Sequence, residues 1–158
     1  MAAPPVTARV LPTHNKIGNG FPTTIALSLN NAINIFEKTV MPPGIDGGEM
    51  IDVTTMLNIA WRTMIPRNLK TLSPITIVGL YSAYLFIDIW AILNQQGAAS
   101  VHFPDGDVLS FYATLNKFEA PAHAEGVAPE GTFTLTPTNW DPVNLVEAAP
   151  IMTSVSGT

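Results

Sequence analysis

The clearest pattern in the chain is a strict alternation of apolar and polar side chains that recurs in several short segments. In residues 23–29, Ile25, Leu27 and Leu29 fall on one side, with threonine, alanine and serine on the other. A period of two is typical of a strand with one buried face. Residues 33–40 form a second predicted strand, in which the alternation slips by one position and indicates a β-bulge.

A β-hairpin is predicted between residues 100 and 118. The Asp-Gly pair in the segment 104–107 supplies a turn residue that tolerates a positive φ. The return strand, 108–118, alternates along its whole length, and residues 132–138 repeat the alternation. The polar face of these two strands includes Ser110, Thr114, Asn116, Thr134 and Thr136.

One helix is predicted, over residues 82–96. Ser82 is a suitable N-cap, Gly97 follows the last residue, and no glycine or proline interrupts the segment. Its apolar face is wider than one sheet would cover, so we expect part of it to pack against a neighbouring subunit. The residues of this face are Leu85, Phe86, Ile89, Trp90 and Leu93.

The order of these elements predicts a mainly β fold, a β-sandwich or open barrel of about six strands with one flanking α-helix. We expect an N-terminal arm over residues 1–20, a β domain over 21–140 and a C-terminal arm over 141–158. Within the domain, residues 41–72 form a long loop that begins with two prolines and three glycines. Inside it, residues 51–55 are compatible with a short strand and residues 57–64 with a helical turn.

Composition raises the question of what covers so much uncharged surface. Only 12% of the 158 residues are charged, against roughly 25% in an average soluble domain. The net charge of −5 disfavours a tight nucleic-acid binder, and the lack of cysteine excludes a disulfide scaffold. The most lipid-like run, 75–93, divides at Ser82 into a predicted strand, 74–81, and the helix, and it contains Asp88, so we expect no membrane insertion.

The residue patterns of common catalytic and metal sites are not found. His14, His102 and His123 have no metal-ligand spacing to one another. The turn Asp105-Gly-Asp107 offers too few oxygens for calcium, and no nucleophile motif is present. We therefore expect neither enzymatic activity nor a cofactor. Strand faces lined by uncharged polar side chains would instead suit a wall past which a polyanion slides, because each lysine or arginine there would hold phosphate.

Several short segments together resemble a known family. Ile51-Asp-Val-Thr-Thr55 is followed by a block ending Trp61-Arg-Thr-Met-Ile-Pro-Arg67, a strand, the helix, Phe103-Pro-Asp-Gly106 and the threonine-rich strand 132–138. In order and spacing, residues 22–142 resemble the major tail tube proteins of long-tailed, siphovirus-type bacteriophages. These proteins are related to the tubes of contractile tails and of type VI secretion.

This resemblance implies a structural virion protein without catalytic residues or cofactors. Six copies would close a ring around an inner β-barrel, and rings would stack through the long loop and the arms into a tube through which DNA passes. Assembly would take place in the cytoplasm of the bacterial host. Expected partners are other copies of the chain, a tape-measure protein, a tail terminator and distal tail or baseplate proteins.

The resemblance also suggests roles for particular residues. The polar strand residues Ser110, Thr114, Asn116, Thr134 and Thr136 would face the lumen, although the opposite parity stays open. The charged residues expected between rings or subunits, with cations of the loop meeting acids of the next ring, are Asp46, Glu49, Arg62, Arg67, Lys70, Asp105 and Asp107.

Two alternatives remain. A tail terminator or head–tail connector would share the fold but form a single ring. A carbohydrate-binding β-sandwich would belong to a different class of protein, and such a module usually offers an exposed aromatic platform. The three tryptophans, Trp61, Trp90 and Trp140, are dispersed over a loop, a helix and a tail, which disfavours this class.

Overall fold

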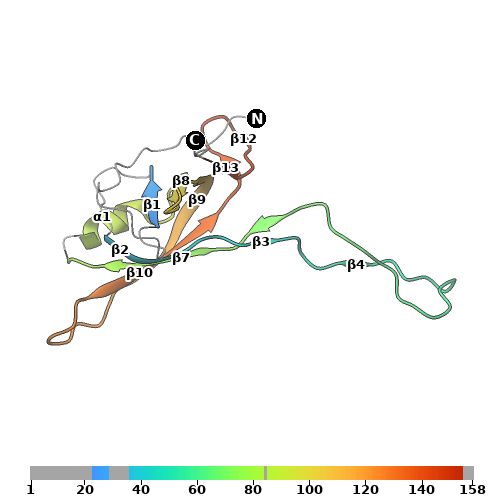
Figure 1. The fold of residues 1–158 in the computed structure, drawn as a ribbon, viewed down its shortest axis with the longest axis horizontal. Helices are drawn as coiled ribbons and strands as arrows, with labels where there is room; N and C mark the ends of the chain where they lie inside the picture. The colour runs from blue at the N-terminus through green and yellow to red at the C-terminus, as the bar shows by residue number, and fades with distance from the viewer. Residues whose placement is uncertain (1–22, 29–35, 84, 155–158) are drawn as a thin grey trace.

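A computed structural model of the chain describes residues 23–28, 36–83 and 85–154. The predicted N-terminal arm over residues 1–20 and the first part of the strand predicted over 33–40 lie outside these residues. The described chain is mainly β with one helix, as the alternation of side chains predicted. Figure 1 shows a folded body from which one long hairpin extends.

The body is built on one antiparallel sheet of seven strands. Six strands follow the order β1-β8-β9-β10-β7-β2, and β13 pairs with the first residues of β9. Their bounds are β1 Thr24–Leu27, β2 Phe36–Met41, β7 Ile75–Leu80, β8 Gln96–His102, β9 Val108–Glu119, β10 Glu130–Pro137 and β13 Ile151–Thr153. The predicted hairpin corresponds to β8 and β9, and Gly106 in its turn has a φ of 96°.

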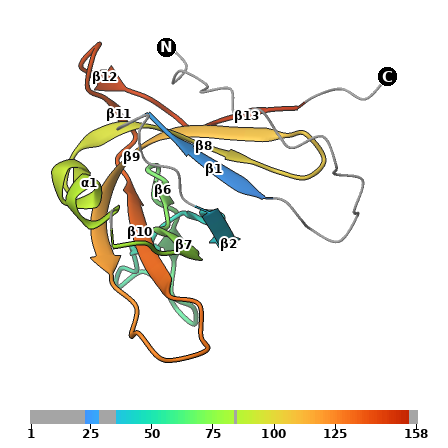
Figure 2. The same cartoon turned by 90° about the vertical axis from the view of Figure 1, so that its left-hand side faces the viewer.

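The sheet is strongly bent, so that its two halves enclose the core. The long strand β9 belongs to both halves, pairing with β8 along its first part and with β10 along its second (Figure 2). A register shift in this second pairing marks a β-bulge, which increases the local bend. The core between the halves includes Ile75, Ile77, Val101, Phe111, Leu115, Phe133 and Leu135.

A β-bulge is present in the second strand, a few positions after the slip between residues 35 and 36 in the sequence that predicted one. In β2, the register with β7 shifts between Glu37 and Thr39, so Lys38 has no partner of its own. The bulge turns Lys38 toward Glu130 on β10, where the two side chains form an ion pair.

A glycine permits close packing where β10 leaves the core. A Cβ atom placed on Gly131 would lie 2.8 Å from the ring of Phe118. Phe118 in turn stacks against Phe133, with 4.8 Å between the ring centroids. A larger residue at position 131 would displace this aromatic pair.

The helix α1, Leu85–Ile92, is shorter than the predicted segment 82–96. It ends early because Asn94 adopts a left-handed conformation, with φ of 64°, and its backbone N–H donates to the Leu115 carbonyl, 2.7 Å away. This hydrogen bond directs the chain into β8, which already begins at Gln96.

Residues 42–72, the hairpin arm, form a long two-stranded projection in place of an irregular loop (Figure 1). At its root, β3 Ile45–Asp46 pairs with β6 Thr71–Leu72. Farther out, β4 Ile51–Asp52 pairs with β5 Met64–Ile65, which confirms a short strand in the segment 51–55.

The C-terminal segment belongs to the folded body up to Thr153, which corrects the expectation of a separate arm from residue 141. A short hairpin of β11 Trp140–Asp141 and β12 Val146–Glu147 is followed by Ala148, which packs with Ala98 and Tyr112 in a second, smaller core. The chain then pairs with β9 through β13.

Candidate assembly interface

The hairpin tip, residues 54–63, is held together by its own polar side chains. The Asn58 side-chain amide donates to the Trp61 carbonyl and the Thr63 hydroxyl, at 3.1 and 2.7 Å, and its oxygen accepts the Thr55 N–H at 2.9 Å. The Thr54 hydroxyl accepts the N–H of Thr63 at 3.0 Å. Because these bonds satisfy the backbone locally, the tip is ordered without a hydrophobic core.

The apolar side chains of the tip point away from this polar frame. Met56 and Ile59 are fully exposed, and the side chain of Trp61 is 85% exposed. Leu57 is exposed as well, and further apolar residues continue along the arm. Contiguous exposed apolar surface of this kind marks a site of protein contact, because leaving it in water is unfavourable.

Sequence reasoning had selected the charged residues of the arm rather than these apolar ones. The signal for them in the sequence is the high frequency of large apolar residues between Met50 and Ile65, within a segment predicted to be a loop. So many large apolar residues are unusual in a loop, because loops run over the surface of a protein and are exposed to water.

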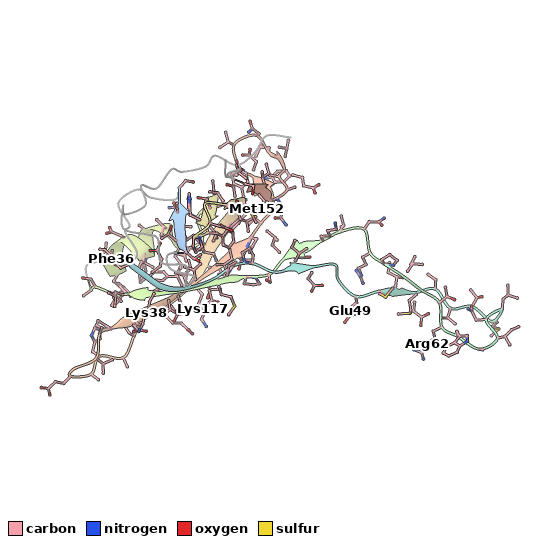
Figure 3. The ribbon with its side chains drawn as sticks, in the orientation of Figure 1. Phe36, Lys38, Glu49, Arg62, Lys117 and Met152 are labelled. Atoms are coloured by element: carbon pink, nitrogen blue, oxygen red, sulfur yellow. The ribbon has the colours of Figure 1, made fainter. Side chains whose placement is uncertain are left out.

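The charged residues predicted for inter-ring contacts fall on two separate elements. Five of them, Asp46, Glu49, Arg62, Arg67 and Lys70, lie on the arm, and Figure 3 shows Glu49 along it and Arg62 near its end. Arg67 supports the arm itself, since its Nε donates to the Glu49 carbonyl at 2.9 Å. Asp105 and Asp107 lie in the β8–β9 turn, where Asp107 accepts a hydrogen bond from the Ser154 hydroxyl.

A second exposed surface is the outer face of the half-sheet β9-β10-β7-β2, which we name the threonine face. The pairing registers place its residues side by side across the four strands. Its polar residues are Thr39, Thr76, Thr114, Thr132, Thr134 and Thr136 together with Lys38, Lys117, Glu119 and Glu130. The same registers place the apolar residues Phe36, Met41, Val78 and Leu80 among them, toward β2 and β7. Of the residues predicted to face a lumen, Thr114, Thr134 and Thr136 lie on this face, and Asn116 is exposed at the bulge of β9.

Both lysines of the threonine face are paired with glutamates of the same chain. Lys38 pairs with Glu130, and Lys117 Nζ lies 2.6 Å from Glu119 Oε1. Figure 3 shows Lys38 and Lys117 on the body, apart from Glu49 and Arg62 of the arm. The face therefore carries both signs of charge in equal number and presents no unpaired cation among its described residues.

Ser110 corrects the predicted lumen-facing set. It lies on the same side of β9 as Thr114, yet it is only 1% exposed, and its hydroxyl has no hydrogen-bond partner within the described chain. The first half of β9 is covered on this side, where Tyr112 packs with Ala98 and Ala148. Side-chain parity along a strand alone did not reveal that one half is covered and the other open.

The helix face predicted for subunit packing is divided by the fold. Ile89 is 2% exposed and Leu85 is partly buried, because both pack against the core of their own chain. The outer side of the helix remains open, with Trp90 74% exposed and in contact with Phe86, at 6.2 Å between ring centroids. Leu93 follows the helix and is also exposed.

A buried carboxylate organises the C-terminal segment beside the root of the arm. Asp141 accepts hydrogen bonds from the side-chain amide of Asn144 at 2.7 Å and from the backbone N–H of Val143 at 2.9 Å. The Asn144 bond is the main cause that holds the pKa of Asp141 below its ordinary value of 3.8. Burial and a hydrogen bond to Asp141 raise the pKa of Tyr112.

Replacing Asp141 with asparagine should lower the melting temperature at neutral pH. The melting temperature of the variant should also fall less steeply than that of the wild type as the pH is lowered. The pKa of Asp141 is lower in the folded chain than in the unfolded chain. The ionised carboxylate therefore stabilises the fold at any pH above the pKa of the unfolded chain, and this stabilisation is lost as the pH falls through the pKa of the folded chain. Thermal unfolding followed by circular dichroism from neutral pH to about pH 2 measures this effect. The exposed residue Glu125 supplies the control, Glu125→Gln; equal acid dependence of wild type and Asp141→Asn would contradict the prediction.

The described part of the chain contains neither a cluster of metal ligands nor a membrane-spanning helix. No group of three or more histidine, aspartate or glutamate side chains there is placed to hold a metal ion. Among the same residues, no helix is both long and apolar enough to cross a membrane.

Comparison with known proteins finds likeness in structure but not in sequence. Neither a protein-family model nor a curated protein matches the chain. A solved structure described as "Virion of native gene transfer agent (GTA) particle" contains a chain with a similar fold, at 14% sequence identity and a TM-score of 0.55. The superposition covers 84% of this chain and 95% of that chain. At 14% sequence identity, this likeness establishes the fold of the chain and nothing beyond the fold.

Proposed function

We propose that this chain is a structural virion protein, the subunit of a bacteriophage tail tube. Six copies close a ring, rings stack into a hollow tube, and DNA passes through the lumen. The observation that carries the proposal is the hairpin arm, because its hydrogen-bonded tip projects apolar side chains for which the described chain provides no cover. The fold shared with a chain of a virion particle supports the same assignment.

The two candidate surfaces have different roles in this proposal. The arm makes the contacts between copies, which bury its apolar side chains. The threonine face lines the lumen, because its hydroxyl groups, its apolar side chains and its internally paired lysines offer DNA phosphates no free cation to bind. Closure of neighbouring sheets into a ring would also cover sheet edges that invite aggregation.

The proposal assigns further properties that follow from this role. The chain has no catalytic function and no cofactor, it resides in the virion tail, and it is assembled in the host cytoplasm. Besides its own copies, it contacts a tape-measure protein, a tail terminator and distal tail or baseplate proteins.

Negative-stain electron microscopy of the purified full-length protein tests the proposal. We expect hollow tubes built of stacked rings. Isolated rings that never stack would contradict the tube and favour a tail terminator or head–tail connector. Monomers at all protein concentrations would contradict a self-assembling virion protein and favour a carbohydrate-binding β-sandwich instead.

A further inference from the structure

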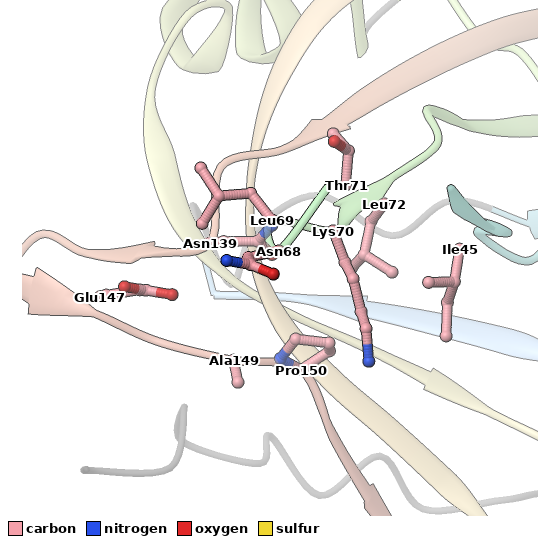
Figure 4. A pocket seen from close by; sticks show the side chains of 10 residues that line it. All are labelled: Ile45, Asn68, Leu69, Lys70, Thr71, Leu72, Asn139, Glu147, Ala149 and Pro150. Atoms are coloured by element: carbon pink, nitrogen blue, oxygen red, sulfur yellow. The ribbon is translucent and has the colours of Figure 1, made fainter. Parts of the chain in front are cut away.

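A pocket of about 460 Å³ lies at the root of the arm, between the arm and the C-terminal segment. Its apolar lining includes Ile45, Leu69, Leu72 and Pro150. Glu147 and Lys70 lie on different sides of it (Figure 4). Pockets of about 300–1,000 Å³ enclose ligands of several rings, so this one has room for a single large side chain.

We propose that this pocket receives Trp61 of a second copy of this chain, and that Arg62 of that copy pairs with Glu147 at the pocket rim. The inference rests on the proposed function, since it names the contact by which copies join. It goes beyond that function by assigning both partners of the contact to particular residues.

The occupant comes from another copy because a chain cannot fill its own pocket. Ile45 lines the pocket, whereas the tip begins about ten residues farther along an extended strand, which corresponds to about 30 Å. Pairing of β4 with β5 and the bond from Arg67 to the Glu49 carbonyl keep the arm extended. The tip of each copy is therefore held away from the pocket at its own root (Figure 1).

Charge selects Trp61 from the exposed apolar side chains of the tip. Arg62 follows it directly in sequence, while Met56, Leu57 and Ile59 have no charged neighbour. Within the described chain, neither Arg62 nor Glu147 forms an ion pair, so each can take a partner from another copy. The backbone at Trp61 is fixed, because its carbonyl accepts the hydrogen bond from Asn58.

The tip and the pocket are different surfaces of the same chain, so the contact is head-to-tail. Such contacts repeat from copy to copy and give closed rings or open filaments, depending on the rotation between copies. Trp and Arg are also the residue types that most often dominate the binding energy of protein interfaces.

Site-directed cross-linking tests the contact directly, because the chain contains no cysteine. Copies carrying Arg62→Cys are mixed with larger, tagged copies carrying Glu147→Cys and treated with a short bis-maleimide, which adds one cysteine thiol at each end. An arginine–glutamate pair separates the Cβ atoms by more than a disulfide permits, so direct oxidation is not used. We expect mixed dimers from this pair and none from the control pair Arg62→Cys with Val127→Cys, whose Val127 is exposed on the loop between β9 and β10.

Charge reversal provides an independent test of the contact. Arg62→Glu or Glu147→Arg alone should raise the protein concentration needed for assembly about ten-fold or more, and the double reversal should largely restore it. Circular dichroism verifies that each variant is folded.

The two tests separate the contact from the proposed function. Tubes that form without cross-linking of the Arg62–Glu147 pair, or a double reversal that does not restore assembly, would overturn the contact but leave the proposed function standing. Cross-linked oligomers that never become tubes would retain the contact and contradict the proposed function, and unassembled wild-type protein would contradict both.

Discussion

Replacing Leu57, Ile59 and Trp61 with serine is expected to abolish tube formation while leaving the subunit folded. Each of these side chains contributes about 1.5–3 kcal/mol when it passes from water into an apolar contact. Losing three of them weakens each contact between copies by roughly three orders of magnitude or more. Folding is unaffected, because the exposed tip shares no contact with the core of the body.

Electron microscopy and sedimentation measure the assembly of this triple variant, and thermal unfolding measures its stability. Val127→Ser is the matched control, since Val127 is an exposed apolar residue of the body rather than the arm. Normal tubes from the triple variant would show that the tip is not part of the contact between copies. A lowered melting temperature would instead place these side chains in the fold.

Removing the two glutamates that pair with the lysines of the threonine face is expected to make the tube bind DNA. In Glu119→Gln with Glu130→Gln, Lys117 and Lys38 lose their partners and become available to phosphate. Both pairs are substantially exposed, and exposed ion pairs contribute about 0–1 kcal/mol, so the variant should remain folded. Each phosphate neutralised adds about −0.9 to the slope of log affinity against log salt concentration.

The measurement is the affinity of assembled tubes for short duplex DNA over a range of salt concentrations. We expect weak binding by the wild type and tighter, strongly salt-dependent binding by the double variant. Glu125→Gln with Asp88→Asn changes the net charge equally, but Glu125 lies in the loop between β9 and β10 and Asp88 on the helix, so this variant should resemble the wild type. Equal gains from both double variants would attribute the effect to net charge alone and contradict the role of this face.

The sequence located most of the strands because strand patterning is a local property. The alternation in 132–138 and in 108–118, the Asp-Gly turn between β8 and β9, and the apolar run before Ser82 all lie where the structure has β10, β9, the turn and β7. The helix was placed correctly, but its end was not. Whether Asn94 continues the helix depends on the Leu115 carbonyl, which comes from a strand 21 residues later.

The candidate surfaces were less accessible to sequence reasoning. The charged residues of the arm were selected because the resemblance to tail tube proteins places this loop between rings, where its cations would meet acids. The structure adds that Met56, Leu57, Ile59 and Trp61 at the tip are all exposed. Likewise, Ile89 and Trp90 are neighbours in an apolar run, and only the packing of the helix shows that the first is buried and the second open.

By itself, the sequence determined the mainly β character of the chain, its single helix, the positions of its principal strands and the low charge that calls for a partner surface. These features follow from backbone preferences and from the period of apolar residues, both of which act over a few positions. The tertiary structure alone decided which side of each strand is covered, as Ser110 and Thr114 illustrate on the same side of β9. It also decided that residues 42–72 form an extended hairpin, which depends on pairings between residues up to 27 positions apart. The pocket at the root of this hairpin depends on contacts over a longer range still, since it is lined by Ile45 as well as Pro150.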